Sequence, residues 1–175
     1  MKVEKVEKET KCCAVISPDV VKSLESQLVQ EMHNMRIYQK FATYFNNVGL
    51  NDLVKYYRTR ANEELQHYTN ICEFLENNLV DYNFHDIPKI DIEIKDSIEP
   101  FEMTVQLELD TTKSLYDIYD DANENQDYIT MQWLMNPNGL IAEQSEEMRT
   151  SNKALEIAKM NLDWISKAKA ISDLL

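Results

Sequence analysis

Apolar residues recur three and four positions apart in four stretches of this chain, which is the period expected of a helix that buries one face. The four predicted seams, in chain order, are Leu24, Leu28, Glu31, Met35, Tyr38, Ala42 and Phe45; Tyr57, Ala61, Glu64, Tyr68, Ile71 and Leu75; Phe101, Val105, Glu108, Thr112, Leu115, Tyr119 and Ala122; and Leu140, Gln144, Glu147, Ser151, Ala154 and Ala158. The pattern predicts four helices around one core, and therefore an all-α four-helix bundle.

The breaks between the seams predict where the helices begin and end. A serine, a proline and an acid at residues 17–19 form a typical helix start, so the first helix should begin there and end near Gly49. The second helix should span residues 51–78. Residues 79–97 include Pro88 and show no helical period, which predicts an extended connection that can cross the length of a bundle.

The third and fourth helical regions are separated by a polar turn at residues 123–127. The third helix should begin near Ser97 or Pro100. In the fourth region the Asn136–Gly139 stretch must break the helix, because Pro137 has no amide hydrogen and clashes with the preceding turn. The asparagine and glycine that follow this proline suit a turn with positive φ.

The chain therefore divides into three regions. Residues 1–16 alternate lysine and glutamate and are expected to form a solvated tail, in which Cys12 and Cys13 are free thiols. Residues 17–160 are expected to form the bundle. Residues 161–175 are expected to form a short fifth helix at the C-terminus.

Composition narrows the class of protein. The 175 residues suit a single core, and the presence of only two glycines and four prolines favours helices over strands. A formal net charge of −13 opposes binding to nucleic acid or anionic membranes, and no apolar run of about 18 residues could span a membrane. Three cysteines cannot form a disulfide framework and no apolar signal segment precedes the first two, so the expected location is the cytoplasm.

Each predicted helix places one carboxylate inside an otherwise mainly apolar seam. These residues are Glu31, Glu64, Glu108 and Glu147. An ionised carboxylate without a partner is costly to bury, and the seams contain no lysine or arginine that would neutralise four of them. A cation is therefore expected among them.

One histidine and one glutamine favour a metal ion as that cation. Glu64 and His67 stand three residues apart and so project from the same side of a helix, and Gln144 and Glu147 have the same spacing. Four carboxylates with one imidazole form an oxygen-rich site that suits iron or manganese better than structural zinc. A single Glu-x-x-His pair is often only a surface pair, whereas one acid in each of four seams is much less expected by chance.

The stretch from about Ser17 to Ala158 resembles the bacterial non-haem ferritins of the ferritin family. The motifs that carry the resemblance are the Glu63-Glu64-Leu65-Gln66-His67 block, Tyr38, the isolated Glu108, the Glu143-Gln144-Ser145-Glu146-Glu147 block, and the separations of Glu31 from Glu64 and of His67 from Glu108. The resemblance implies a ferritin-like four-helix bundle with a long connection between the second and third helices. A short insertion between Trp133 and Glu143 departs from the family pattern.

The resemblance also implies a di-iron centre in the core of the bundle, with one carboxylate shared by both ions. The ligands that it assigns are Glu31, Glu64 and His67 for the first iron, and Glu64, Glu108 and Glu147 for the second, with Gln144 beside the second.

Further residues extend this implied site. Glu63, Glu143 and Glu146 match a third, weaker iron site that shares Glu147 and leads toward an inner cavity. Tyr38 matches a tyrosine that can donate an electron, although plain core packing is the other interpretation of that residue. No haem is expected, because the haem-binding methionine and the second Glu-x-x-His of haem-containing relatives are both missing from the matching positions.

The resemblance therefore implies an iron-storage ferroxidase that oxidises Fe(II) with dioxygen or hydrogen peroxide. Copies of the chain would assemble into a hollow shell of about 24 subunits that holds the iron mineral. One alternative is a ferritin-like di-iron redox protein that detoxifies peroxide without storage. Another is a structural bundle without catalysis.

Overall fold

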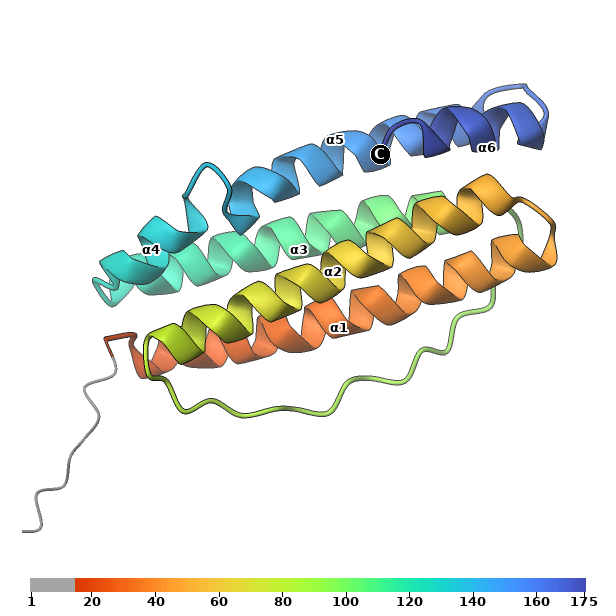
Figure 1. The fold of residues 1–175 in the computed structure, drawn as a ribbon. Helices are drawn as coiled ribbons and strands as arrows, with labels where there is room; N and C mark the ends of the chain where they lie inside the picture. Colours follow the sequence, from red (N-terminus) through yellow and green to blue (C-terminus); the bar gives the residue numbers. More distant parts are fainter. Residues whose placement is uncertain (1–14) are drawn as a thin grey trace, which may run out of the picture.

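The computed structural model of the chain describes residues 15–175, which form six α-helices and no strand (Figure 1). In chain order the helices are α1 (Pro18–Asn47), α2 (Asn51–Asn77), α3 (Glu99–Glu124), α4 (Tyr128–Leu134), α5 (Leu140–Lys159) and α6 (Trp164–Ser172). The predicted all-α class is confirmed. The part of the predicted tail that holds Cys12 and Cys13 lies outside the described residues.

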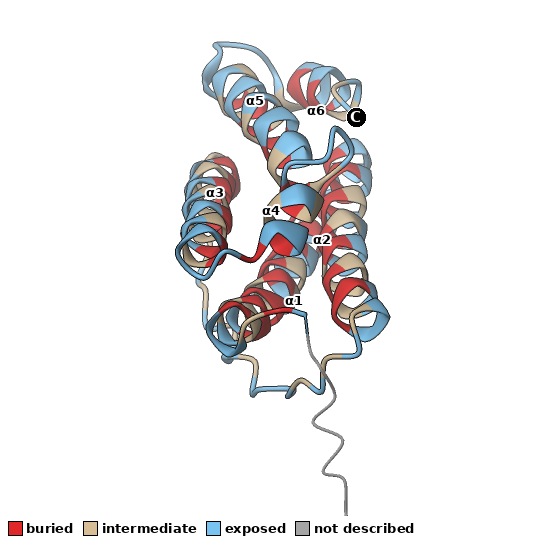
Figure 2. Cartoon of the chain, turned by 90° about the vertical axis from the view of Figure 1, so that its left-hand side faces the viewer, coloured by how far each residue is buried: buried red, intermediate tan, exposed pale blue. Residues whose placement is uncertain are grey.

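Four long helices lie side by side around one core. α1 packs along α2, α3 packs along α5, and α1 also packs against α3. In the end-on view the buried faces of these helices point toward the centre (Figure 2). α6 folds back against α2 and α5, so the predicted four-helix bundle with a short C-terminal helix is confirmed. None of the six described helices has the length and apolar content that a membrane span requires.

The connection between α2 and α3 runs along the outside of the bundle from one end to the other (Figure 1). It contains neither helix nor strand, as predicted. Glu25, which is buried on α1, anchors it. Oε1 of Glu25 accepts a hydrogen bond from the backbone nitrogen of Asn83 at 2.7 Å, and Oε2 lies 2.8 Å from Nε2 of His85.

Helix α1 begins at the serine and proline that predict its start. Oγ of Ser17 accepts a hydrogen bond from the backbone nitrogen of Val20 at 3.3 Å, and Pro18 occupies the first turn, where no amide hydrogen is needed. Ile16 is buried in the core, so the packed part of the chain begins just before this cap. Between α1 and α2, Gly49 has a φ of 79°, which glycine adopts without strain in a short turn.

A break separates α4 from α5 in the Asn136–Gly139 stretch, as predicted. Gly139 has a φ of −92°, so the expectation of a positive φ there is wrong. Glycine is needed for space instead, because a Cβ atom would lie 2.6 Å from the backbone oxygen of Trp133 and 2.8 Å from that of Leu134. After the break, every position predicted for the fourth seam is buried in α5.

The apolar core consists of two clusters. One contains aromatic rings of α1, α2 and α3, where Phe45 and Tyr57 stack with ring centroids 5.5 Å apart. The other contains aliphatic side chains such as Leu24, Leu75 and Leu115. The buried acids stand between these clusters along each helix, so the bundle has a polar layer in its middle.

Candidate metal centre

Each long helix brings one carboxylate into the polar layer. Glu31 comes from α1, Glu64 from α2, Glu108 from α3 and Glu147 from α5. All four are buried, as the seam pattern predicts, with exposed fractions of 1%, 2%, 1% and 9% in that order. Buried carboxylates repel one another and need cations, and the structure divides these four into two pairs with different partners.

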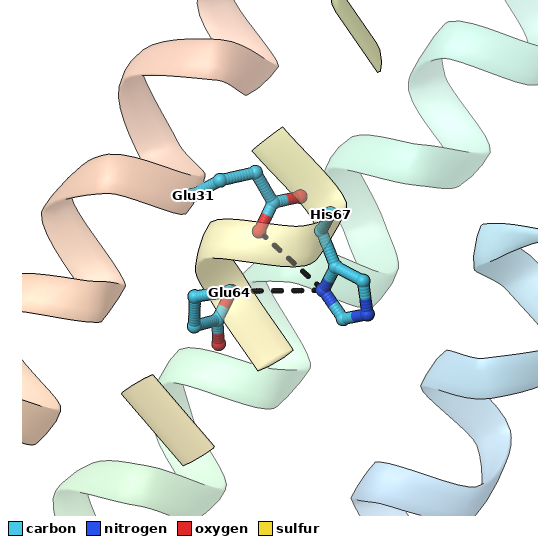
Figure 3. A group of neighbouring side chains, drawn as sticks. All are labelled: Glu31, Glu64 and His67. Atoms are coloured by element: carbon cyan, nitrogen blue, oxygen red, sulfur yellow. Dashed lines mark ion pairs between the residues drawn. The ribbon is translucent and has the colours of Figure 1, made fainter. Parts of the chain in front are cut away.

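Glu31 and Glu64 face His67 in one half of the layer (Figure 3). Nδ1 of His67 lies 3.8 Å from Oε2 of Glu31 and 3.8 Å from Oε2 of Glu64. One ligand atom from each of the three residues lies within 4.8 Å of the others, which allows one metal ion to contact all three. Within residues 15–175 this is the only group of three or more acidic, histidine or cysteine side chains at such a spacing.

Two carboxylate oxygens in this cluster have no hydrogen-bond partner in the described part of the chain. Oε2 of Glu31 and Oε2 of Glu64 are buried and accept no hydrogen bond from the described part of the chain. Oε1 of Glu31, in contrast, accepts one from Nε2 of Gln27 at 2.7 Å. Because buried acceptors are nearly always satisfied, the two free oxygens and the imidazole fit a cation, and this donor set suits iron or manganese.

The charges of the cluster depend on whether that cation is present. Burial raises the pKa of both carboxyl groups, and the charge of Glu64 raises that of Glu31 further. Burial lowers the pKa of His67, but the neighbouring carboxylates, Glu143 among them, outweigh burial and raise it to about 12. Without a metal ion the imidazole is therefore protonated. A metal ion must displace that proton, because only a neutral imidazole is a ligand.

Glu108 and Glu147 face an arginine in the other half of the layer. Arg60 stands one turn before Glu64 on α2, and its side chain is only 2% exposed. Its Nη2 lies 2.5 Å from Oε1 of Glu108, and its Nη1 lies 3.1 Å from Oε1 of Glu147. Burial lowers the pKa of Arg60, but the charges of these two acids outweigh burial and raise it above its usual value. The expectation that the seams contain no lysine or arginine is therefore wrong.

The sequence does contain a signal for Arg60. It follows Tyr57 by three residues and precedes Glu64 by four, so it lies on the helix face that both of them share. The apolar periodicity does not predict Arg60 as a core residue, because arginine is rarely buried unless it is paired. The pairing acids lie on α3 and α5, far away in the sequence.

Both oxygens of Glu108 have partners inside the protein. Oε1 accepts hydrogen bonds from Arg60 and from the hydroxyl of Tyr38, and Oε2 accepts one from Nε2 of Gln144 at 2.7 Å. Tyr38 is fully buried, and burial together with the charge of Glu108 raises its pKa. The structure thus gathers Arg60, Tyr38 and Gln144 around the carboxylate of Glu108.

The three acids assigned by resemblance to a third iron site lie near the edge of the layer. They belong to an acidic pocket of about 220 Å³ that is lined by Glu63, Gln66, His67, Glu143, Glu146 and Glu147. Glu63 pairs with Arg60 at 2.8 Å, and Oε2 of Glu143 lies 3.4 Å from Nε2 of His67. Glu146 is exposed and pairs with Arg149 at 2.6 Å. These acids therefore have separate partners and do not converge on one point.

The sequence and the fold both match known proteins. Residues 21–160 match the family described as Ferritin-like domain. The chain is 26% identical over 136 residues to a bacterial non-heme ferritin of Staphylococcus haemolyticus, which covers 78% of this chain and 80% of the relative. It is also 26% identical over 133 residues to one of Staphylococcus saprophyticus, which covers 76% of this chain and 78% of the relative.

The structure resembles an open-pore ferritin from the archaeon Archaeoglobus fulgidus, with a TM-score of 0.80 and 23% sequence identity. The superposition covers 91% of this chain and 98% of the archaeal one, which confirms the ferritin-like bundle. Family and fold together support an iron-storage ferritin and imply iron binding. The chain belongs to the ferritin family.

Proposed function

We propose that this chain is the subunit of a cytoplasmic iron-storage shell and that it oxidises Fe(II) to Fe(III) before storage. Fe(II) is the substrate, and dioxygen or hydrogen peroxide is the oxidant. The observation that supports the proposal best is the pair of buried carboxylate oxygens on Glu31 and Glu64, which face His67 and have no hydrogen-bond partner in residues 15–175.

The charge of this cluster favours oxidation as well as binding. Two carboxylates in a buried site stabilise the higher charge of Fe(III) more than that of Fe(II), since charges attract more strongly where water is excluded. The imidazole of His67 supplies a third, neutral ligand once its proton has left. The cluster therefore binds Fe(II) and favours the loss of its electron.

The acidic pocket supplies a route for iron. Its acids attract cations from solvent, and Glu143 places a carboxylate 3.4 Å from Nε2 of His67, directly beside the cluster. An incoming Fe(II) would meet these side chains first, and Fe(III) would pass over them on its way to the mineral. We assign Glu63, Glu143 and Glu146 this transfer role.

Tyr38 is the proposed electron donor beside the centre: one Fe(II) gives the oxidant one of the two electrons that it takes up, Tyr38 would give the other, and a further Fe(II) would reduce the tyrosyl radical. A tyrosine that gives up an electron becomes strongly acidic and needs a base for its proton. The hydroxyl of Tyr38 already donates a hydrogen bond to Oε1 of Glu108, which can take that proton. The two-iron arrangement implied by the resemblance needs Glu108 and Glu147 as ligands, and both of them pair with Arg60.

Oxidation and assembly can be measured on the same sample. The purified chain should elute as a large assembly, oxidise added Fe(II) faster than buffer does, and retain the iron on a second size-exclusion column. Glu31→Gln should abolish the rate gain and keep the assembly, whereas Glu156→Gln, on the exposed face of α5, should change neither.

Two other outcomes are informative. A small species that oxidises Fe(II) but retains no iron would favour the redox protein without storage. A large assembly that oxidises Fe(II) no faster than buffer would contradict the ferroxidase proposal.

A further inference from the structure

We infer that Arg60 takes the place of a second iron ion, so that each subunit binds one iron in its buried centre and not two. The inference rests on the proposed function in one respect, namely that iron binds at Glu31, Glu64 and His67. It differs from the di-iron centre that the resemblance implies. Arg60, which causes this difference in the number of iron ions, is buried on α2 in the same layer as the ligands.

The guanidinium occupies the carboxylate oxygens that a second iron would need. Nη2 of Arg60 lies 2.5 Å from Oε1 of Glu108 and Nη1 lies 3.1 Å from Oε1 of Glu147. A metal ion bound by the same oxygens would sit about 2 Å from each of them, in the space that the guanidinium fills. Arg60 and a second iron therefore exclude each other.

The hydrogen bonds of the buried acids also support a single iron position. Glu31 and Glu64 each have a buried oxygen without a hydrogen-bond partner in the described chain, which is expected of carboxylates that bind a metal ion. Glu108 has no such oxygen, because Arg60 and Tyr38 donate to one and Gln144 donates to the other. Of these three acids, only Glu31 and Glu64 therefore have a buried oxygen left for a metal ion.

Arg60 also differs chemically from His67, the other cation of the layer. Histidine can lose its proton and become a ligand, so a metal ion replaces the proton and the side chain stays in place. Arginine keeps its charge at all relevant pH values and cannot ligate a metal. A second iron could bind only if the whole side chain left the core, and Glu108 and Glu147 would then lose a buried partner.

Arg60 is held in place by more than these two acids. Its Nη1 also donates to Glu63 at 2.8 Å, and its guanidinium carbon lies 5.7 Å from the centre of the Tyr38 ring. Its two terminal nitrogens thus pair with acids of α2, α3 and α5, and the Tyr38 ring of α1 lies beside the guanidinium. This favours a fixed residue over a movable one.

Metal stoichiometry tests the inference directly. The assembled apo protein is titrated anaerobically with Fe(II), and in parallel with Zn(II) as a redox-inert probe, and tightly bound metal is counted per chain by calorimetry. We expect one ion per chain in the parent and two in Arg60→Gln, which removes the charge and opens the space. Arg58→Gln, an equal charge change at an exposed position of α2, should stay at one.

A second variant keeps the test valid if Arg60→Gln fails to assemble. Glu31 belongs only to the first iron in either scheme, so Glu31→Gln should lower the count from one to zero. A fall from two to one would overturn the inference, as would two ions in the parent. Arg60→Gln that still binds one ion would also overturn it, because Arg60 would not be the cause.

The same counts separate this inference from the proposed function. No tight ion in the parent, with no difference between the parent and Glu31→Gln, would mean that the proposed function fails at its binding step. Two tight ions in the parent would leave the proposed function intact and overturn only the role of Arg60.

Discussion

The guanidinium of Arg60 and the carboxylate of Glu108 meet at 2.5 Å in the middle of the bundle, where their side chains are 2% and 1% exposed. This pair joins α2 to α3 at the level where α1 and α2 also present two acids to a histidine. In the half of the layer that contains Glu108 and Glu147, the protein itself supplies the cation, which is Arg60. The other half obtains its cation from a proton on His67 or from a metal ion.

Glu64→Gln should slow Fe(II) oxidation by about tenfold or more, because even residues that only support metal ligands typically contribute a factor of ten. The stability of the metal-free protein should hold or rise, since the change removes a buried charge beside Glu31. Oxidation kinetics and thermal unfolding measure the two effects, with Glu73→Gln on the exposed face of α2 as the control. An unchanged oxidation rate would rule out Glu64 as a ligand.

Arg60→Met should lower the free energy of unfolding by about 3–5 kcal/mol, because it leaves buried carboxylates without their partner. Adding Glu108→Gln should recover part of the loss, so that the double variant is more stable than the sum of the single effects predicts. Denaturant unfolding of the metal-free protein measures this coupling. Arg58→Met should have little effect, and strict additivity of the two core changes would show that the pair is not coupled.

The metal-free protein should become less stable as pH rises. Burial raises the pKa of Glu147 from 4.5 to about 7 in the folded state, so the folded protein holds this proton more tightly than the unfolded chain does. The resulting contribution to the free energy of unfolding is fully present below pH 4.5 and is lost as pH rises through 7. The raised pKa of His67, about 12 against an ordinary 6.5, contributes stability that is full below pH 6.5 and is lost toward pH 12. Each group changes the free energy of unfolding by at most about 1.4 kcal/mol per pH unit.

Melting temperatures between pH 6 and pH 9 measure this slope. His67→Gln should flatten the slope of stability against pH above pH 7, because it removes the contribution of the histidine, whose raised pKa is about 12. Saturation with Zn(II) should reverse the trend, because metal binding releases the proton of His67 and is favoured at higher pH. A metal-free protein that gained stability with rising pH would contradict the charge assignment.

Gly139→Ala should destabilise the protein by about 1–3 kcal/mol, the usual cost of forcing an extra methyl group into a packed site. The new Cβ atom would lie 2.6 Å from the backbone oxygen of Trp133, and backbone atoms cannot move aside as a flexible side chain can. Thermal unfolding compares it with Asn138→Ala in the same loop, where the position is exposed. Equal stability of the two variants would show that the loop rearranges freely.

Most of the bundle follows from local patterns in the sequence. The seam of α5 is an example, since every residue predicted for it is buried even though Pro137 and Gly139 interrupt the helix just before. The extended connection is another, because the absence of a helical period is visible in the sequence. Its docking is not visible, since it depends on Glu25 meeting His85 across a separation of 60 residues.

The centre could be predicted only in part. The periodicity places all four carboxylates in the core, and the Glu64–His67 spacing places a histidine beside them. Whether Arg60 points into the core or toward solvent depends on acids supplied by α3 and α5, which no local pattern on α2 reveals. The four carboxylates by themselves suggest two metal ions, but with Arg60 among them the layer has a position for only one.

A crystal of the assembled protein soaked anaerobically in Fe(II), with iron located by anomalous scattering, shows directly whether Arg60 excludes a second iron. We expect one iron in the buried centre of each subunit, bound by Glu31, Glu64 and His67, with Arg60 still paired to Glu108 and Glu147. An iron held by Glu108 and Glu147 with Arg60 withdrawn, or no iron beside His67, would contradict this expectation.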